Sequence, residues 1–213
     1  MNSIRLSGVT PRFLSDNNAT SDIWRQEVAF RKGDNYLVAA HSGSGKSSLV
    51  AYICGERTDY SGDILLDDHR VETLKPRRWN RVRQQHISCI FQGLRLFADL
   101  SAWENIVLKN NLTNCKSNGE IMQMIETAGL SAKKDEKAGK LSFGQQQRIA
   151  IIRALCQPFD FLLADEPFSH LDDANISVMS RMMTSELHRQ GAGMILCSLG
   201  ASYPFAYRQH LKL

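Results

Sequence analysis

Long apolar runs are missing from this sequence of 213 residues. A membrane-spanning helix needs roughly 18 consecutive apolar residues, and stretches such as residues 161–164 are far shorter. The first fifteen residues also lack the basic start and the continuous apolar stretch of a secretory signal. The sequence therefore predicts a cytosolic chain that does not cross a membrane.

Cysteine and histidine pairs at metal-ligand spacing are missing too. The sequence contains no CxxC pair and no HExxH pattern. The cysteines are odd in number and stand at Cys54, Cys89, Cys115, Cys156 and Cys197. We expect reduced, buried thiols and no metal site built from cysteine or histidine.

Internal repeats and low-complexity tracts are also absent, which argues against a solenoid or a propeller. Hydrophobic residues make up 43% and charged residues 23% of the chain, close to the averages for soluble proteins. The length provides enough interior for one large domain. We therefore expect a single domain over residues 1–213.

Apolar periodicity predicts strands and helices that alternate along the chain. The expected strands are residues 4–9, 26–30, 36–40, 159–164 and 194–197. The expected helices are residues 47–54, 120–128 and 174–190, and Gly129 is expected to end the second. The polar stretch 15–22 is predicted to be a loop. Residues 93–140 favour a helical subdomain inserted into an α/β core with a mostly parallel sheet.

Positive charge is concentrated in residues 70–83, although the net charge of the chain is only +4. This segment contains one acidic residue, Glu72, and six basic residues: Arg70, Lys75, Arg77, Arg78, Arg81 and Arg83. Such a cluster is one signature of nucleic-acid binding. The interleaved Trp79 and Val82 favour the alternative, an amphipathic helix that lies on a core.

A phosphate-binding loop is indicated by the run Ser42-Gly43-Ser44-Gly45-Lys46-Ser47-Ser48, between a predicted strand and a predicted helix. Glycines let backbone N–H groups surround a β-phosphate, and the helix N-terminus favours negative charge. Lys46 would reach the β- and γ-phosphates, and Ser47 would coordinate magnesium. Ala40 departs from the motif by replacing its first glycine. The run favours nucleotide binding over a simple Gly/Ser turn.

Two adjacent carboxylates, Asp165 and Glu166, follow the apolar strand at 159–164. Strand ends are where parallel sheets present ligand groups. Asp165 is suited to hold magnesium through water, and Glu166 is suited to act as general base on an attacking water. Paired acids also occur in exposed turns, so this motif alone does not identify the reaction.

A third motif closely resembles the LSGGQ signature of the ATP-binding cassette (ABC) family: Leu141-Ser142-Phe143-Gly144-Gln145. The phosphate loop precedes it and the acidic strand follows it, in the family's order. Gln92 resembles the family's Q-loop, residues 169–172 resemble its D-loop, and Phe13 resembles its adenine-stacking aromatic. The resemblance implies an α/β fold. This fold has a P-loop NTPase core with a mostly parallel sheet, an N-terminal antiparallel β portion and an inserted helical subdomain at about residues 93–140.

The resemblance also implies that ATP lies between the phosphate loop of one chain and the signature of a second nucleotide-binding subunit, with a homodimer favoured over a heterodimer. Ser142 and the backbone N–H of Gly144 would then meet the γ-phosphate at a helix N-terminus. Phe143 replaces a glycine of the signature. The implied nucleotide contacts are Phe13, Ser42, Gly43, Ser44, Gly45, Lys46, Ser47, Ser48, Gln92, Ser142, Gly144, Gln145 and Asp165. The implied Mg²⁺ ligands are Ser47, Gln92 and Asp165, and the implied catalytic residues are Lys46, Gln92 and Glu166.

Residues 91–108, with Leu96-Phe97 and Glu104-Asn105, are similar to ATPases of lipoprotein-releasing, macrolide-exporting and FtsE-like cell-division complexes. This similarity implies a subunit on the cytoplasmic, inner face of the cell membrane. Apolar residues between Gln92 and Trp103 predict a surface that docks a helix of an integral membrane protein. The similarity also makes the basic segment an ordinary helix of the fold, and we expect no nucleic-acid partner.

Leu199 stands where members of the family carry a histidine that contacts the γ-phosphate and orients the attacking water. Leucine does neither. Two functions follow from the resemblance: an ATPase subunit that drives a membrane complex, or an ATP-operated clamp or regulatory scaffold with weak hydrolysis. A third alternative, a soluble nucleic-acid ATPase, is suggested by the basic segment, but the sequence contains neither a coiled coil nor an additional DNA-binding module.

Overall fold

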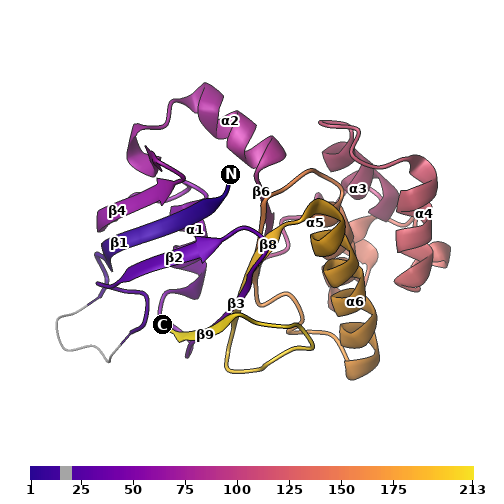
Figure 1. Ribbon diagram of the computed structural model, residues 1–213. Coiled ribbons are helices and arrows are strands. Elements are labelled where there is room, and N and C mark those ends of the chain that lie inside the picture. Colours follow the sequence, from indigo (N-terminus) through magenta and orange to yellow (C-terminus); the bar gives the residue numbers. More distant parts are fainter. Residues whose placement is uncertain (15–20) are drawn as a thin grey trace.

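The computed structural model describes residues 1–14 and 21–213. Two β-sheets lie side by side, and helices cover the outer face of one of them (Figure 1). The predicted loop at residues 15–22 falls mostly outside the described residues. Its last two residues, Ser21 and Asp22, lie in neither a helix nor a strand.

The first sheet is antiparallel and has the strand order β2-β1-β4-β5. Its strands are β1 (Ser3–Pro11), β2 (Glu27–Arg31), β4 (Tyr60–Leu66) and β5 (His69–Arg70). Along β1, the buried Ile4 and Leu6 flank the exposed Arg5, because successive side chains of a strand point to opposite faces. The predicted N-terminal antiparallel portion is thereby confirmed.

The second sheet is parallel at each of its strand pairs and has the order β6-β7-β8-β3-β9. Its strands are β3 (Asn35–Ala39), β6 (Ile87–Ile90), β7 (Phe161–Asp165), β8 (Gly193–Ser198) and β9 (Gln209–Lys212). Leu162 packs into one hydrophobic core and Leu163 into the other. A strand buried on both faces has a continuous apolar sequence, which is why β3, β7 and β8 were predictable.

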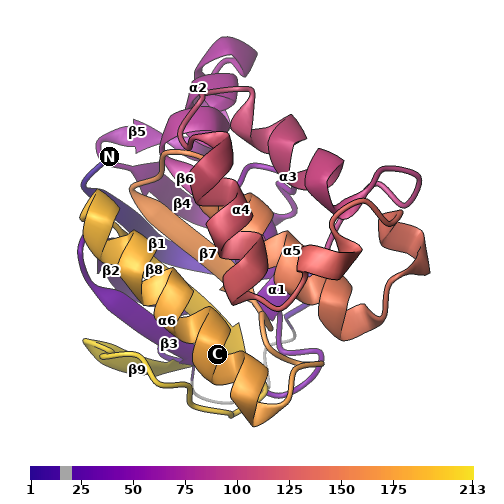
Figure 2. The same ribbon diagram turned by 90° about the vertical axis from the view of Figure 1, so that its right-hand side faces the viewer.

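Helices pack against both faces of the parallel sheet. On one face, α1 (Lys46–Ile53) and α2 (Pro76–Gln85) share a core with the antiparallel sheet. On the other, α5 (Phe143–Leu155) and α6 (Asp173–Gln190) lie across the strands (Figure 2). The basic segment is helical only from Pro76, because proline favours the first helical turn. Before that point Arg70 belongs to β5, and residues 71–73 form the 3₁₀ turn η1 (Val71–Thr73).

Residues 93–140 contain two short helices, α3 (Ala102–Asn110) and α4 (Asn118–Thr127), and two 3₁₀ turns, η2 (Ser131–Lys133) and η3 (Ala138–Lys140). Ser101 and Ser117 begin the helices, and each forms a reciprocal capping box with the glutamate three residues later. Gly129 follows α4 with a φ of 66°, as expected for a helix stop. Among the described residues, no helix has the length and apolar character that would let it span a membrane.

Candidate nucleotide-binding site

Parallel strands bring several of the predicted site residues to one edge of the sheet. The phosphate loop follows β3, Gln92 follows β6, and β7 ends at Asp165. Because these strands run in the same direction, their carboxyl ends share an edge, where open α/β sheets bind ligands.

The phosphate loop has a backbone that requires glycine. Gly45 caps α1 with a φ of 103°, and Gly43 has a φ of 80°, both in the left-handed region. A Cβ atom at Gly45 would lie 2.8 Å from the ring of Phe13. Trp24 also stabilises the loop, because its indole N–H donates a hydrogen bond to the Ser44 carbonyl at 3.2 Å. Both the backbone and the aromatic neighbour therefore exclude a larger residue at Gly45.

Lys46 is buried at the start of α1 and turns its ammonium group back into the loop. The Nζ atom donates to the His41 carbonyl at 3.2 Å and to the Ala40 carbonyl at 3.4 Å. It also lies 3.3 Å from Oε1 of the buried Glu166. The lysine predicted to bind phosphate and the predicted general base thus form an ion pair.

Three oxygen-bearing side chains converge beside this pair. The Ser47 hydroxyl donates to Asp165 Oδ2 at 2.5 Å and lies 3.3 Å from Gln92 Oε1. Asp165 Oδ1 is buried and has no hydrogen-bond partner among the described residues. Burial raises the pKa of Asp165, an effect that the Ser47 hydroxyl opposes and Glu166 reinforces. An orphaned carboxylate oxygen beside a hydroxyl and an amide oxygen fits Mg²⁺, which prefers oxygen ligands and few carboxylates.

A cavity of about 280 Å³ opens above these groups. It is lined by Phe13, Ser42, Gly43, Gly45, Lys46, Ser47, Ser48, Gln92 and Glu166. Phe13 is 45% exposed at its mouth. Of the other predicted residues, Ser44 lies in the same loop and Asp165 lies buried behind Ser47.

The signature residues lie outside this cavity and begin α5. Ser142 and Gln145 form a reciprocal capping box, in which each side chain accepts a backbone N–H of the other. A Cβ atom at Gly144 would lie 2.9 Å from the His170 carbonyl oxygen, so glycine is needed for packing within the chain. None of Ser142, Gly144 and Gln145 lines the cavity that contains the phosphate loop.

Gln147 is a site residue that sequence reasoning missed. Its buried amide N–H donates to the Glu166 carbonyl at 3.1 Å, and its oxygen accepts from the His170 N–H at 3.0 Å. Glu166 itself has a φ of 50°, which is unusual for a residue with a side chain. Gln147 therefore holds the backbone that follows β7. Its position three and four residues before the apolar Ala150 and Ile151 places it on the buried helix face, a signal available in the sequence.

Leu199 follows the end of β8, and its side chain is 56% exposed. The nearby Ser198 hydroxyl donates to the Ala201 carbonyl at 2.6 Å and accepts from the Gly200 N–H. His170 is occupied elsewhere, because its ring lies 4.2 Å from that of Phe143 and its Nδ1 lies 2.9 Å from the Ser169 hydroxyl. Leu199 has no imidazole, and the imidazole of His170 contacts Phe143 and Ser169, so neither of these two positions brings an imidazole to Lys46.

Comparison with known proteins gives a consistent set of relatives. The cell division ATP-binding protein FtsE of Mycobacterium tuberculosis is 30% identical over 200 residues, which cover 92% of this chain and 84% of FtsE. The lipoprotein-releasing system ATP-binding protein LolD of Treponema denticola is 26% identical over 197 residues, which cover 91% of this chain and 87% of LolD. The macrolide export ATP-binding/permease protein MacB of Campylobacter jejuni is 34% identical over 174 residues. This match covers 79% of the chain but only 27% of MacB.

Solved structures confirm the predicted fold class. The dimeric bacterial ABC transporter cassette MJ0796 superimposes with a TM-score of 0.81 at 24% sequence identity, over 98% of this chain and 94% of that one. The model of the ABC transporter family matches residues 25–169, more than half of the sequence. The chain therefore belongs to the ABC transporter family and is an ABC-type ATPase domain.

Proposed function

We propose that residues 1–213 act as one nucleotide-binding domain that hydrolyses ATP with Mg²⁺ and, in pairs, powers a separate membrane complex. The observation that carries this proposal is the cavity at the end of the parallel sheet. It gathers the phosphate loop, Gln92 and Glu166, with Asp165 buried behind them. Relatives named for lipoprotein release, cell division and macrolide export support the proposal.

Each residue of the cavity has a separate task in this proposal. Backbone N–H groups of residues 42–48 and the Lys46 ammonium bind the β- and γ-phosphates, and Phe13 stacks on adenine. Ser47, Gln92 and Asp165 would hold Mg²⁺, which neutralises phosphate charge when bound. Glu166 accepts a proton from the attacking water. Gln147 fixes the backbone on which Glu166 stands.

Pairing of two chains follows from the position of the signature. Ser142 and Gly144 open a helix N-terminus, which favours an anion, yet they lie outside the cavity of their own chain. A second copy in head-to-tail orientation supplies them to the γ-phosphate. The dimeric state of MJ0796 supports the pairing of two chains.

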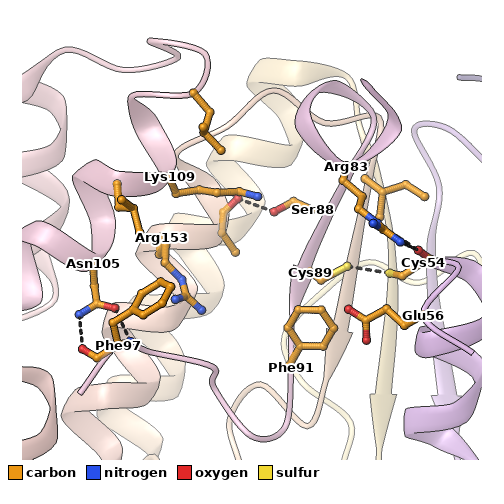
Figure 3. A pocket seen from close by; sticks show the side chains of 14 residues that line it. Cys54, Glu56, Arg83, Ser88, Cys89, Phe91, Phe97, Asn105, Lys109 and Arg153 are labelled. Carbon is orange, nitrogen blue, oxygen red and sulfur yellow. Dashed lines mark hydrogen bonds between the residues drawn. The ribbon is translucent and has the colours of Figure 1, made fainter. Parts of the chain in front are cut away.

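A groove beside Gln92 is the proposed docking site for the membrane partner. It has a volume of about 290 Å³ and lies between α3, α5 and β6 (Figure 3). Of the apolar residues predicted to dock, Leu94 is buried and Leu96 and Trp103 pack on the core, whereas Phe97 is 56% exposed. Leu108 and Leu112 extend this exposed apolar surface along one side of the groove.

The charge of the groove indicates what kind of segment it accepts. The Lys109 side chain makes no hydrogen bond or ion pair with any described residue, and burial lowers its pKa. Burial also lowers the pKa of Arg153 to about 10, while the groove's carboxylate, Glu56, is paired with Arg95 at 2.6 Å. We infer an amphipathic helix of an integral membrane protein that carries a carboxylate opposite Lys109. Such a partner places the chain on the cytoplasmic face of the membrane.

The alternative function is an ATP-operated clamp with weak hydrolysis. Leu199 favours it, because this exposed leucine cannot orient water at the γ-phosphate. In the clamp, ATP binding still closes the pair of chains, and only turnover is slow.

The experiment that tests nucleotide binding is calorimetry with Lys46→Ala. Loss of a charge-assisted contact of about 1.5 to 3 kcal/mol should weaken ATP binding roughly ten- to a hundredfold. Lys75→Ala removes an exposed lysine outside the cavity and is the matched control. Circular dichroism verifies that both variants fold. Equal ATP affinity in wild type and Lys46→Ala would refute the proposed role.

A further inference from the structure

Two cysteine thiols meet in the wall of the docking groove. Cys54 stands at the C-terminal end of α1, and Cys89 lies in β6. Their Sγ atoms are 3.0 Å apart although the residues are 35 positions apart in sequence, and Figure 3 shows the two side chains pointing at each other. Both cysteines line the groove.

The two thiols differ in access to solvent. Cys54 is 3% exposed, and Arg83 donates to its backbone carbonyl at 3.0 Å. Its hydrogen bond with Cys89, together with burial, raises the pKa of the Cys54 thiol well above its usual range. Cys89 is partly exposed to the groove. A reagent in the groove therefore meets Cys89 first.

We propose that Cys54 and Cys89 form a dithiol site that exchanges with small-molecule disulfides, with Cys89 as the attacking thiol and Cys54 as the resolving thiol. Formation of a disulfide needs the sulfurs to close from 3.0 Å to about 2.05 Å, a small movement for two side chains already in contact. In a reducing compartment the dithiol is the resting form.

The exchange proceeds in two balanced steps. The Cys89 thiolate attacks one sulfur of a disulfide RSSR, forms a mixed disulfide and releases RS⁻. Cys54 then loses its proton and attacks Cys89 Sγ, which breaks the mixed disulfide and releases the second RS⁻. The protons of the two protein thiols end on the two released thiolates. The protein dithiol is oxidised, and RSSR is reduced to two RSH.

The position of the pair connects it to the phosphate site. α1 begins at Lys46 and ends beside Cys54, and β6 contains Cys89 and leads to Gln92. Near the start of α1, the Ser47 hydroxyl lies 3.3 Å from Oε1 of Gln92, which follows Cys89 by three residues. A disulfide would therefore add a second connection between α1 and the β6–Gln92 segment, at the C-terminal end of the helix. A regulatory effect on ATP turnover rests on the proposed function, whereas the exchange chemistry does not.

The test treats the purified full chain with glutathione disulfide, alkylates the remaining thiols after acid quenching, and maps the peptides by mass spectrometry. We expect an intramolecular bond between Cys54 and Cys89 that dithiothreitol reverses. Cys54→Ser should accumulate glutathione on Cys89, because the resolving thiol is gone. Cys89→Ser should leave Cys54 free, because Cys54 is buried. This readout measures thiols alone, so its outcome is independent of nucleotide binding.

Cys115 provides the matched control. It is also partly exposed, but it faces Arg189 at 3.7 Å rather than a second thiol, and the Cys115→Ser variant should form the Cys54–Cys89 bond like wild type. In urea, which unfolds the chain, the same treatment should attach glutathione to all cysteines without preference. The proposal is overturned if Cys54 and Cys89 stay free in the folded wild type while Cys115 is modified. It is also overturned if the two variants react alike.

Discussion

At the scale of single residues, Lys46 and Glu166 form an ion pair at the proposed phosphate site. Both are buried, and a buried charge without a partner is costly. The γ-phosphate of ATP would offer Lys46 a second anion. We infer that nucleotide binding draws the ammonium away from Glu166 and leaves the carboxylate ready to accept a proton from water. The ion pair thus links substrate binding to the availability of the base.

Leu199 gives a prediction about rate. Leu199→His should supply the γ-phosphate contact that the family resemblance assigns to this position, and the exposed position leaves room for an imidazole ring. A preorganised group at the reacting centre contributes about 2.7 to 4 kcal/mol to transition-state stabilisation, so turnover should rise roughly a hundred- to a thousandfold. The measurement is phosphate release at saturating ATP, with ATP affinity nearly unchanged.

The matched control at this position is Leu199→Ala, which removes the leucine without supplying an imidazole and should stay slow. Brisk hydrolysis by wild type, abolished by Glu166→Gln and not increased by Leu199→His, would mean that another residue orients the water. The clamp alternative would then lose its main support.

At the scale of elements, the sequence predicted those strands whose pattern is local. β7 and β8 have continuous apolar runs because both of their faces are buried. β4 was missed because it depends on a distant contact. A Cβ atom at Gly62 would lie 2.5 Å from the Gly8 carbonyl oxygen, next to a register shift in β1. The site residues divide in the same way, into those found by local motifs and those that depend on distant contacts. Motifs located the phosphate loop and Glu166, whereas Trp24 and Gln147 act through contacts between segments distant in sequence.

The groove between α3 and β6 gives a prediction about the membrane partner. A photo-crosslinker at Asp99, whose side chain is 98% exposed, should capture an integral membrane protein in cells. Lys109→Glu should reduce this capture about tenfold or more, because it replaces the unpaired cation with a charge that repels the expected carboxylate. Mass spectrometry of the crosslinked product identifies the partner.

Lys75→Glu makes the same charge change on an exposed lysine outside the groove and should leave capture intact. Capture of only soluble proteins or nucleic acid would contradict the docking proposal. Equal capture by Lys109→Glu and Lys75→Glu would contradict the inferred carboxylate.

At the scale of the whole molecule, one chain carries two parts of the proposed ATP site, and it does not itself bring them together. Gln147 connects them, because it lies in α5 just after the signature and holds the backbone of Glu166 and His170. An anion bound at Ser142 would therefore affect Glu166, the proposed general base of the same chain. In a head-to-tail pair, each chain would sense the nucleotide held by the other. We infer that the two ATP sites of the pair are coupled.

The pairing itself is testable with a substitution that preserves the helix cap. In a Glu166→Gln background, which removes the proposed general base and should therefore slow hydrolysis, sedimentation velocity should show dimers with ATP and monomers without it. Ser142→Asp keeps an N-cap residue on α5 but places a carboxylate where the partner's γ-phosphate is expected, so dimers should weaken about tenfold or more. Ser117→Asp makes the same change in the equivalent capping box of α4 and should dimerise normally. Dimers of Ser142→Asp that are as stable as those of Ser117→Asp would show that the signature does not meet the nucleotide of a second chain.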